Sequence, residues 1–412
     1  LARDMAQTQP MLRPVQGDVG SGKTLVAARA ALDTIAAGYQ VAFMAPTELL
    51  AEQHFATLDA WLTPLGQPVA WLSGRTKGQA RQQVLQALAS GDAPLVVGTH
   101  ALFQHDVHFH RLGLIIVDEQ HRFGVHQRLS LADKGVGDEH PHQLALTATP
   151  IPRSLAMVAY GDLDCSVIDE LPPGRQPVTT TLMDHTRRDA VMRRVGNACR
   201  EGRQAYWVCT AIEESDTLDI EAAEATLDQL QQALPDVQIG LVHGKLKPAE
   251  KATVMAAFKA GEIQLLVATT VIEVGVDVPN ASLMIIDNAE RLGLAQLHQL
   301  RGRVGRGAVD SHCLLLYRQP LSDTAQQRLK VMQESHDGFV IAEADLEIRG
   351  PGELLGTRQT GLAAFRIALL PEHEPLLVEA QDIAARLYAR DPGRAKALMQ
   401  RWAGARADLA RV

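Results

Sequence analysis

The residues from Gly17 to Thr24, GDVGSGKT, constrain the fold of this chain more than any other segment. They match the pattern GxxxxGK[ST] in full and lead into a helical stretch rich in Ala, Leu and Arg. Glycines at these positions let successive backbone N–H groups and a helix N-terminus surround phosphate oxygens. The segment therefore predicts an α/β fold with a nucleotide-binding phosphate loop. A glycine turn before a helix is the plain alternative, and the order and spacing of Gly, Lys and Thr disfavour it.

Each side chain of this loop has an expected role. Lys23 is expected to hold the β- and γ-phosphates, and Thr24 to place its hydroxyl on Mg²⁺, with Ser21 as a minor partner. The sequence thus predicts ATP and Mg²⁺ as cofactors. The predicted nucleotide contacts within the loop are Gly17, Asp18, Val19, Gly20, Ser21, Gly22, Lys23 and Thr24.

Short apolar runs rich in β-branched residues alternate with longer helical patterns from about residue 14 to residue 317. This alternation is typical of parallel βαβ architecture. We expect a first set of strands at 41–45, 95–99, 113–118 and 143–147. We expect a second set at 204–210, 238–243, 264–268, 282–287 and 312–317. The pattern predicts two α/β lobes in series.

Three prolines in the stretch from Gly161 to Pro177 indicate the connection between these lobes. We therefore expect a first lobe at 1–160, a connection at 161–180 and a second lobe at 181–335. After these, 336–412 is expected to form a helical hairpin and a helical tail, with a tight turn at Arg349–Gly352 between two helices.

A second motif, LGLIIVDEQH, is an apolar run that ends in Asp118 and Glu119. Because strand ends in doubly wound sheets face the ligand crevice, the two carboxylates are expected beside the phosphates. Asp118 suits the metal, and Glu119 suits a general base that activates the attacking water. A solvated strand end is the commoner explanation of such a pair, but its place after the phosphate loop favours catalysis.

A third motif, HQLRGRVGRG, brings Arg301, Arg303 and Arg306 close together. Three guanidinium groups repel one another unless anions compensate them, which favours a phosphate-facing role over a solvated helix. Arg303 and Arg306 are the candidate arginine fingers, expected to neutralise the γ-phosphate when the lobes close.

Composition limits the class of protein and the kind of partner. With 46% apolar and 21% charged residues among 412, the chain is expected to be globular and multi-lobed. Its net charge of −8 argues against a protein that coats nucleic acid, so any such contact must come from local patches. The arginines of the later third, Arg301, Arg303, Arg306, Arg349, Arg358 and Arg366, are one candidate patch.

The four cysteines form no CxxC pair, which favours reduced thiols. No export signal or apolar span is evident in the sequence, so we expect a cytoplasmic protein.

With these three motifs in order, the chain resembles superfamily 2 helicases. APTELLAEQH from Ala45 and GTHALF from Gly98 resemble motifs that grip a nucleic-acid strand, and TATPIPRS from Thr147 resembles the motif that couples hydrolysis to that grip. HGKL and ATTVIEVGVDVPNA resemble their second-lobe counterparts. The resemblance implies nucleic-acid contacts at Pro46, Thr47, Thr99, His243, Gly244, Thr269 and Thr270. It also implies further nucleotide contacts at Gly275 and Asp277.

Within that superfamily the chain is most similar to the RecG family of branch-migration translocases. DEQHRFGVHQR from Asp118 and RGPGELLGTRQ from Arg349 carry this similarity, and the second lies in an element expected to convert lobe closure into movement on duplex DNA. The coupling residues implied are His121, Thr147, Thr149, Gln299, Arg349, Arg358 and Gln359.

The resemblance implies an ATP-dependent helicase that regresses stalled forks and migrates Holliday-type junctions. A monomer is expected, and single-stranded DNA-binding protein is a further expected partner. Members of the family carry an N-terminal wedge domain, and because the chain opens about sixteen residues before the phosphate loop, we expect a fragment that lacks it. A transcription-repair coupling motor, an RNA helicase and a nucleotide-gated binding module without turnover remain the alternatives.

Overall fold

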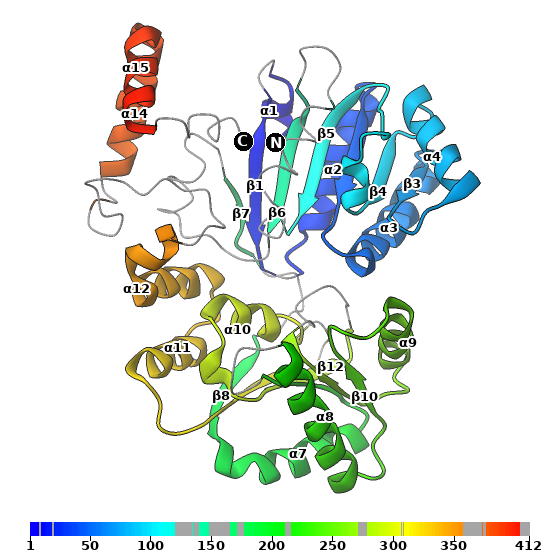
Figure 1. The fold of residues 1–412 in the computed structure, drawn as a ribbon, viewed down its shortest axis with the longest axis vertical. Helices are drawn as coiled ribbons and strands as arrows, with labels where there is room; N and C mark the ends of the chain where they lie inside the picture. The colour runs from blue at the N-terminus through cyan, green and yellow to red at the C-terminus, as the bar shows by residue number, and fades with distance from the viewer. Residues whose placement is uncertain are drawn as a thin grey trace. The chain divides into compact units, whose positions relative to one another are not determined.

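A computed structural model of the chain describes residues 1–7, 10–18, 20–119, 134, 140–147, 165–170, 177–210, 216–270, 278–305, 307, 309–356, 373 and 376–403. The chain divides into two compact units (Figure 1). Unit 1 comprises Leu1–Gly17, Gly22–Ile168 and Arg349–Val412, and unit 2 comprises Asp18–Ser21 and Asp169–Ile348. The change between units at Asp169 falls inside the segment expected to connect the two lobes.

Unit 1 contains a seven-stranded sheet in which every paired strand runs parallel. Across the sheet the order is β3 (Val69–Leu72), β4 (Leu95–Gly98), β2 (Gln40–Met44), β5 (Leu112–Asp118), β6 (His142–Thr147), β1 (Leu12–Gly17) and β7 (Ser166–Ile168). Its helices include α1 (Ala2–Met5), α2 (Lys23–Ala36), α3 (Glu48–Leu62) and α4 (Gly78–Ser90), with short 3₁₀ turns η1 (Thr63–Leu65) and η2 (His100–Phe103).

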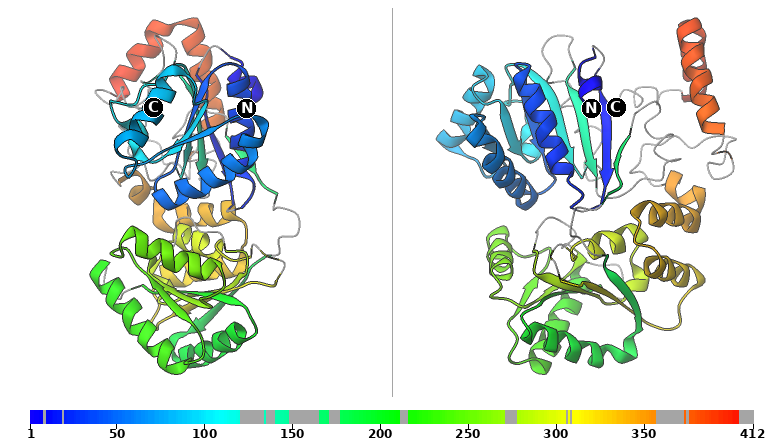
Figure 2. Two further views of the ribbon diagram at one scale, coloured as in Figure 1. Left: turned by 90° about the vertical axis from the view of Figure 1, so that its right-hand side faces the viewer. Right: turned by 180° about the vertical axis from the view of Figure 1, so that it is seen from behind.

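Unit 2 contains a six-stranded parallel sheet. The order is β10 (Ile239–Val242), β11 (Leu265–Ala268), β9 (Gln204–Val208), β12 (Ala281–Ile286), β13 (His312–Tyr317) and β8 (Thr179–Asp184). Around it lie α7 (Arg188–Arg200), α8 (Asp216–Ala233), α9 (Pro248–Lys259), α10 (Leu294–Arg301) and α11 (Asp323–Glu334), with 3₁₀ turns η4 (His185–Arg187) and η6 (Ala289–Arg291). Figure 2 shows helices on both faces of this sheet.

Both sheets are buried on both faces, which explains why their central strands are almost wholly apolar. In β9, Tyr206 and Val208 enter one hydrophobic cluster while Ala205 and Trp207 enter the other. In β2, Val41 and Phe43 lie in one cluster and Ala42 and Met44 in the other. Since successive side chains of a strand point to opposite faces, each sheet is the middle layer of three.

The fold class expected from the sequence, two parallel-sheet lobes followed by C-terminal helices, is confirmed. All nine expected strands are present, and β1, β3, β7 and β8 are additional. The four cysteines are free thiols, of which Cys199, Cys209 and Cys313 are buried.

The turn expected at Arg349–Gly352 is wrong. The backbone there belongs to α12 (Gly338–Gly356), which continues through Pro351. A proline removes one helical hydrogen bond and strains the preceding turn, so it can be accommodated without ending the helix. Two further helices, α14 (Leu376–Arg390) and α15 (Pro392–Ala403), pack on each other.

The close pairing of β3 and β4 leads to a prediction about stability. A Cβ atom added to Gly98 would lie 2.0 Å from the backbone oxygen of Leu72, whereas one added to Gly74 would meet nothing within 4 Å. We expect Gly98→Ala to destabilise the protein by about 1–3 kcal/mol, as overpacking does. Urea unfolding followed by circular dichroism measures this, with Gly74→Ala as the control. Equal unfolding midpoints for the two variants would contradict the close approach.

Candidate nucleotide and nucleic-acid site

The phosphate loop connects the carboxyl end of β1 to the first residue of α2. Gly20 and Gly22 have φ angles of 83° and 97°, in the left-handed region that side chains other than glycine rarely adopt. Gly22 is the N-cap of α2, so the free N–H groups of the first helical turn open onto the loop. Lys23 Nζ donates a hydrogen bond to the carbonyl of Gly17 at 2.7 Å, which holds the amine over the loop.

Asp118 is the last residue of β5, and its carboxylate is fixed by two contacts. Oδ1 accepts the backbone N–H of Glu119 at 3.0 Å, and Oδ2 lies 2.7 Å from Nε2 of His54. Glu119 has a φ of 51°, an unusual conformation for a residue with a side chain, and it turns the chain sharply after the strand. Local strain of this kind is common at functional sites.

The sheet topology brings Lys23 and Asp118 to one edge. In the strand order, β6 alone separates β1 from β5, and all three run parallel. Their carboxyl ends therefore lie about 10 Å apart, two strand spacings. This distance suits a phosphate group with its metal ion between an amine and a carboxylate.

The residues present fit a magnesium ion bound together with a nucleotide. Thr24 offers a hydroxyl on the first turn of α2, and Asp118 offers a carboxylate held in place by its neighbours. Mg²⁺ usually takes one or two protein oxygens and completes its shell with water and phosphate. Among the described residues, no group of three or more His, Cys, Asp or Glu side chains could hold a metal ion.

His54 is a site residue that the sequence did not reveal. It lies on α3, is buried beside the ring of Phe43 with centroids 4.6 Å apart, and contacts a carboxylate 64 positions away. The only signal was its place in APTELLAEQH, whose other residues were expected to contact nucleic acid. The contact links that segment directly to Asp118.

Several residues expected to contact nucleic acid lie at strand ends. Thr99 follows β4 and Thr269 follows β11, and each has a buried hydroxyl with no hydrogen-bond partner among the described residues. His243, after β10, has an equally unpartnered Nδ1 within that part of the chain. Thr47 instead caps α3, because its hydroxyl accepts the N–H of Leu50. Of the others, Gly244 is exposed, and Pro46 and Thr270 are partly buried.

The expected phosphate-facing role of Arg301 is wrong. Arg301 ends α10 and is 4% exposed, and its guanidinium donates to the carbonyls of Met332 at 3.0 Å and Ser335 at 2.7 Å. Burial lowers the pKa of this arginine. Backbone carbonyls at the C-terminal end of α11 compensate its charge, so Arg301 joins two helices of unit 2.

The other expected residues of the second lobe are only partly described. Arg303 and Gln299 are buried, at 8% and 7% exposure. Thr147, at the end of β6, is also buried. Arg349 is described through its backbone alone. The expected residues outside the described part of the chain are Val19, His121, Thr149, Gly275, Asp277, Arg306, Arg358 and Gln359, together with Arg366 of the candidate basic patch.

Comparison with known proteins agrees with this geometry. The family model "DEAD/DEAH box helicase" matches residues 2–158, and "Helicase conserved C-terminal domain" matches 187–308. A third, "ATP-dependent DNA helicase RecG, domain 3, C-terminal", matches 335–401. The ATP-dependent DNA helicase RecG of Escherichia coli (strain K12) is 65% identical over 404 residues, which cover 98% of this chain. The chain belongs to the RecG family.

Other relatives and solved structures are also similar to this RecG-family chain. RecG of Pasteurella multocida is 60% identical over 98% of the chain, and RecG of Bacillus subtilis 47% over 95%. The chain spans about 58% of the length of the curated relatives it matches first. A structure of RecG bound to a three-way DNA junction aligns with a TM-score of 0.74 and 44% identity, covering 91% of this chain and 48% of that one. The helicase MrfA bound to DNA, at 18% identity and a TM-score of 0.61, shares the fold.

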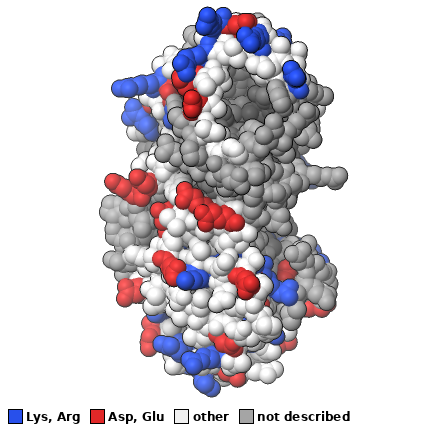
Figure 3. Space-filling view, turned by 90° about the vertical axis from the view of Figure 1, so that its left-hand side faces the viewer, with Lys and Arg blue, Asp and Glu red and all other residues white. Residues whose placement is uncertain are grey.

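Two of the six arginines of the predicted basic patch have described side chains, and neither of these two is exposed. Arg301 and Arg303 are buried and cannot form a surface patch. In Figure 3 basic side chains are concentrated over α14 and α15, and elsewhere on that face acidic and basic side chains are mixed. The exposed basic residues of these two helices are Arg386, Arg390, Arg394, Lys396 and Arg401.

The contact between His54 and Asp118 leads to a prediction about metal dependence. We expect His54→Ala to weaken Mg²⁺-dependent nucleotide binding by about 10- to 100-fold, the usual effect of removing a residue that orients a metal-binding carboxylate. His54→Gln, which keeps a donor, should recover part of the loss, and exposed His105→Ala should cause none. Titration of a fluorescent ADP analogue at several Mg²⁺ concentrations measures it. An unchanged Mg²⁺ requirement in His54→Ala would mean that the histidine has only a packing role.

Proposed function

We propose that this chain is the motor part of an ATP-dependent translocase that remodels branched duplex DNA. The observation that carries the proposal is the shared carboxyl edge of β1 and β5, where a phosphate loop faces the Asp118–Glu119 pair. Membership of the RecG family and the likeness to a RecG structure bound to a three-way DNA junction support branched DNA as the substrate. The expected regression of forks and migration of Holliday junctions follow from the same relationship.

Each residue of the edge has a defined task in hydrolysis. Lys23 neutralises phosphate charge, and the helical N–H groups after Gly22 hold phosphate oxygens. Thr24 and Asp118 are the ligands proposed for Mg²⁺, which supplies charge neutralisation when bound. Glu119 orients a water molecule and accepts its proton. Arg303 and Arg306 are the residues proposed to stabilise charge on the γ-phosphate.

The strand-end residues are proposed as the contacts to DNA. Thr99 and Thr269 carry hydroxyls with no partner among the described residues, and a phosphate oxygen could accept from either. A translocase must pass over any sequence, so phosphate contacts suit the task better than contacts to base edges. Binding should therefore weaken steeply as the salt concentration rises.

Several expectations remain predictions. These are the monomeric state, the cytoplasmic location and single-stranded DNA-binding protein as a partner. In the described part of the chain, none of the helices combines the length and apolar character that a membrane span needs. The coupling roles of His121, Thr147, Thr149, Gln299, Arg349, Arg358 and Gln359 are proposals of the same kind.

The decisive test is the rate of ATP hydrolysis with and without a branched DNA. We expect DNA to stimulate hydrolysis and Glu119→Gln to lower kcat by about 10²- to 10⁴-fold, because the amide cannot accept a proton. Nucleotide affinity should be retained, since Lys23 and Thr24 are untouched. Exposed Glu201→Gln on unit 2 is the matched control and should hydrolyse ATP at the parent rate.

Two results would contradict the proposal. Equal residual rates in the parent and Glu119→Gln would indicate a nucleotide-gated binding module without turnover. Stimulation by RNA duplexes but not by DNA would identify an RNA helicase.

A further inference from the structure

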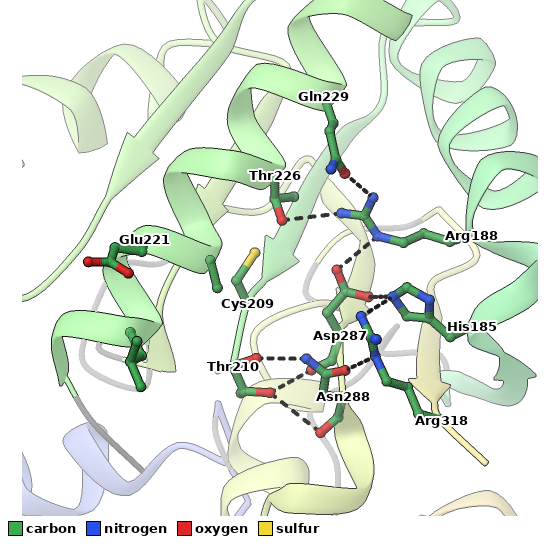
Figure 4. A pocket seen from close by; sticks show the side chains of 12 residues that line it. His185, Arg188, Cys209, Thr210, Glu221, Thr226, Gln229, Asp287, Asn288 and Arg318 are labelled. Atoms are coloured by element: carbon green, nitrogen blue, oxygen red, sulfur yellow. Dashed lines mark hydrogen bonds and ion pairs between the residues drawn. The ribbon is translucent and has the colours of Figure 1, made fainter. Parts of the chain in front are cut away.

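A cavity of about 600 Å³ lies at the carboxyl edge of the sheet in unit 2 (Figure 4). Its walls are the residues that follow the strands, among them Thr210 after β9, Asp287 and Asn288 after β12, and Arg318 after β13. Helices α7 and α8 and the turn η4 complete it. None of these residues was assigned a role in nucleotide or DNA binding above.

The cavity occupies the place in unit 2 that the nucleotide site occupies in unit 1. The order β10-β11-β9-β12-β13-β8 repeats the order β3-β4-β2-β5-β6-β1, so β12 corresponds to β5 and β8 to β1. Ligands bind at the carboxyl ends of such sheets, where the strand order reverses. The helix after β1 begins with Lys23, and the helix after β8 begins with Arg188.

Backbone geometry supports the same correspondence. Among the described residues, Glu119 and Asn288 are the ones other than glycine with a positive φ, at 51° and 50°. Each directly follows an aspartate, Asp118 at the end of β5 and Asp287 just after β12. The amide of Asn288 then joins two strands, because Nδ2 donates to the carbonyl of Thr210 at 2.7 Å and Oδ1 accepts from Arg318 at 2.9 Å.

The two arginines of the cavity differ in their capacity for a ligand. Arg188 is satisfied, since its guanidinium donates to Asp287, Gln229 and Thr226. The guanidinium of Arg318 donates only to neutral groups in the described part of the chain, Asn288 Oδ1 through Nε and His185 Nε2 through Nη2 at 3.2 Å, although its charge also acts on the carboxylate of Glu290. A guanidinium carries five N–H donors, so Nη1 and one N–H of Nη2 are available to an anion.

The environment of His185 depends on Arg318. Its Nε2 faces an N–H of Arg318, so it acts as an acceptor and the ring is neutral. Burial lowers the pKa of His185, and the charges of Arg318 and Arg188 lower it further, against the opposing effect of Asp287 and Asp184. On α8, Glu221 also lines the cavity.

One carboxylate oxygen of Asp287 accepts no hydrogen bond from the described residues. Its side chain is 7% exposed, and Oδ1 has no hydrogen-bond partner among the described residues. Nε2 of His185 lies 3.8 Å from this oxygen. A buried carboxylate oxygen without a donor is costly, so a state of the site in which His185 donates to it would be favoured.

We propose that this cavity is a binding site for a phosphate group, which the free edge of the Arg318 guanidinium holds. Anion binding neutralises Arg318 and draws it away from His185. Nε2 then takes a proton from solvent and donates it to Asp287 Oδ1. Phosphate binding and proton uptake are thereby coupled at a site separate from the phosphate loop, and the site does not depend on ATP hydrolysis.

The first test follows the ring signals of His185 by NMR while inorganic phosphate is added, with the phosphate loop saturated by ADP and Mg²⁺. His185→Gln identifies the signals. We expect a saturable shift, and affinity about tenfold or more weaker in Arg318→Gln, because a charge-assisted hydrogen bond is lost. Arg318→Lys, which keeps the charge, should bind with intermediate affinity and serves if the glutamine variant does not fold. Exposed Arg193→Gln on α7 is the matched control.

The second test uses sulfate, which does not change its charge between pH 6 and 8. Since binding takes up a proton at His185, affinity for sulfate should be at least about threefold higher at pH 6 than at pH 8. In His185→Gln the difference should vanish. The same pH dependence in both proteins would overturn the coupling to His185.

The third test distinguishes the two sources of a phosphate group, free phosphate and the backbone of DNA. If a short DNA duplex displaces sulfate from the site, as the His185 ring signals would report, the site binds the phosphodiester backbone. If the duplex and sulfate bind at the same time, the site binds free phosphate. Either result retains the site. The proposed site is overturned if the His185 signals do not change on addition of phosphate, sulfate or duplex. It is also overturned if the parent and Arg318→Gln bind phosphate with equal affinity. Because no turnover is measured, this failure would be distinct from a failure of DNA-stimulated hydrolysis.

Discussion

The parallel arrangement of strands determines where chemistry can occur in this chain. Both faces of each sheet are buried, so side chains along β2, β5, β9 and β12 are apolar and serve packing. Polar groups become available only where the backbone leaves a strand. Because all strands of a sheet run in one direction, these exits share one edge, and residues distant in sequence meet there. Asp118 and Lys23 in unit 1, and Asp287 and Arg318 in unit 2, are the result.

The same constraint explains which strands the sequence could predict. The nine expected strands include all the interior ones except β1, and their apolar character is unmistakable. Three of the four missed strands, β3, β7 and β8, lie at a sheet edge, and most of their residues are only partly buried. The TTTLMD of β8 reads as polar because an edge strand has one neighbour to pair with. A run of apolar residues therefore predicts burial, and it predicts a strand only where the strand is itself buried.

The candidate site shows a similar division. The phosphate loop and the Asp118–Glu119 pair could be found because their chemistry requires residue types at fixed local spacing. Arg301 was misassigned because neighbouring arginines look alike in sequence, whereas its bonds to the carbonyls of Met332 and Ser335 form only when α10 packs beside α11. His54 was missed because its contact with Asp118 forms only when β2, α3 and β5 pack together. Local chemistry is readable from sequence, and contacts made by folding are not.

Under the two proposals, one fold separates anion binding in unit 2 from hydrolysis in unit 1. A buried glutamine is the first residue of both β2 and β9. The side-chain amide of Gln40 donates to the carbonyl of Leu88 in α4, and that of Gln204 donates to the carbonyl of Phe258 in α9. At the functional edge, in contrast, the units differ. Glu119 offers a carboxylate that can accept a proton, but its counterpart Asn288 offers an amide that cannot. Asp287 is paired with Arg188 at 3.2 Å, so it is less available to a metal than Asp118. An anion held in unit 2 would therefore be bound without being hydrolysed, and its effect would be limited to charge and to the proton that His185 takes up.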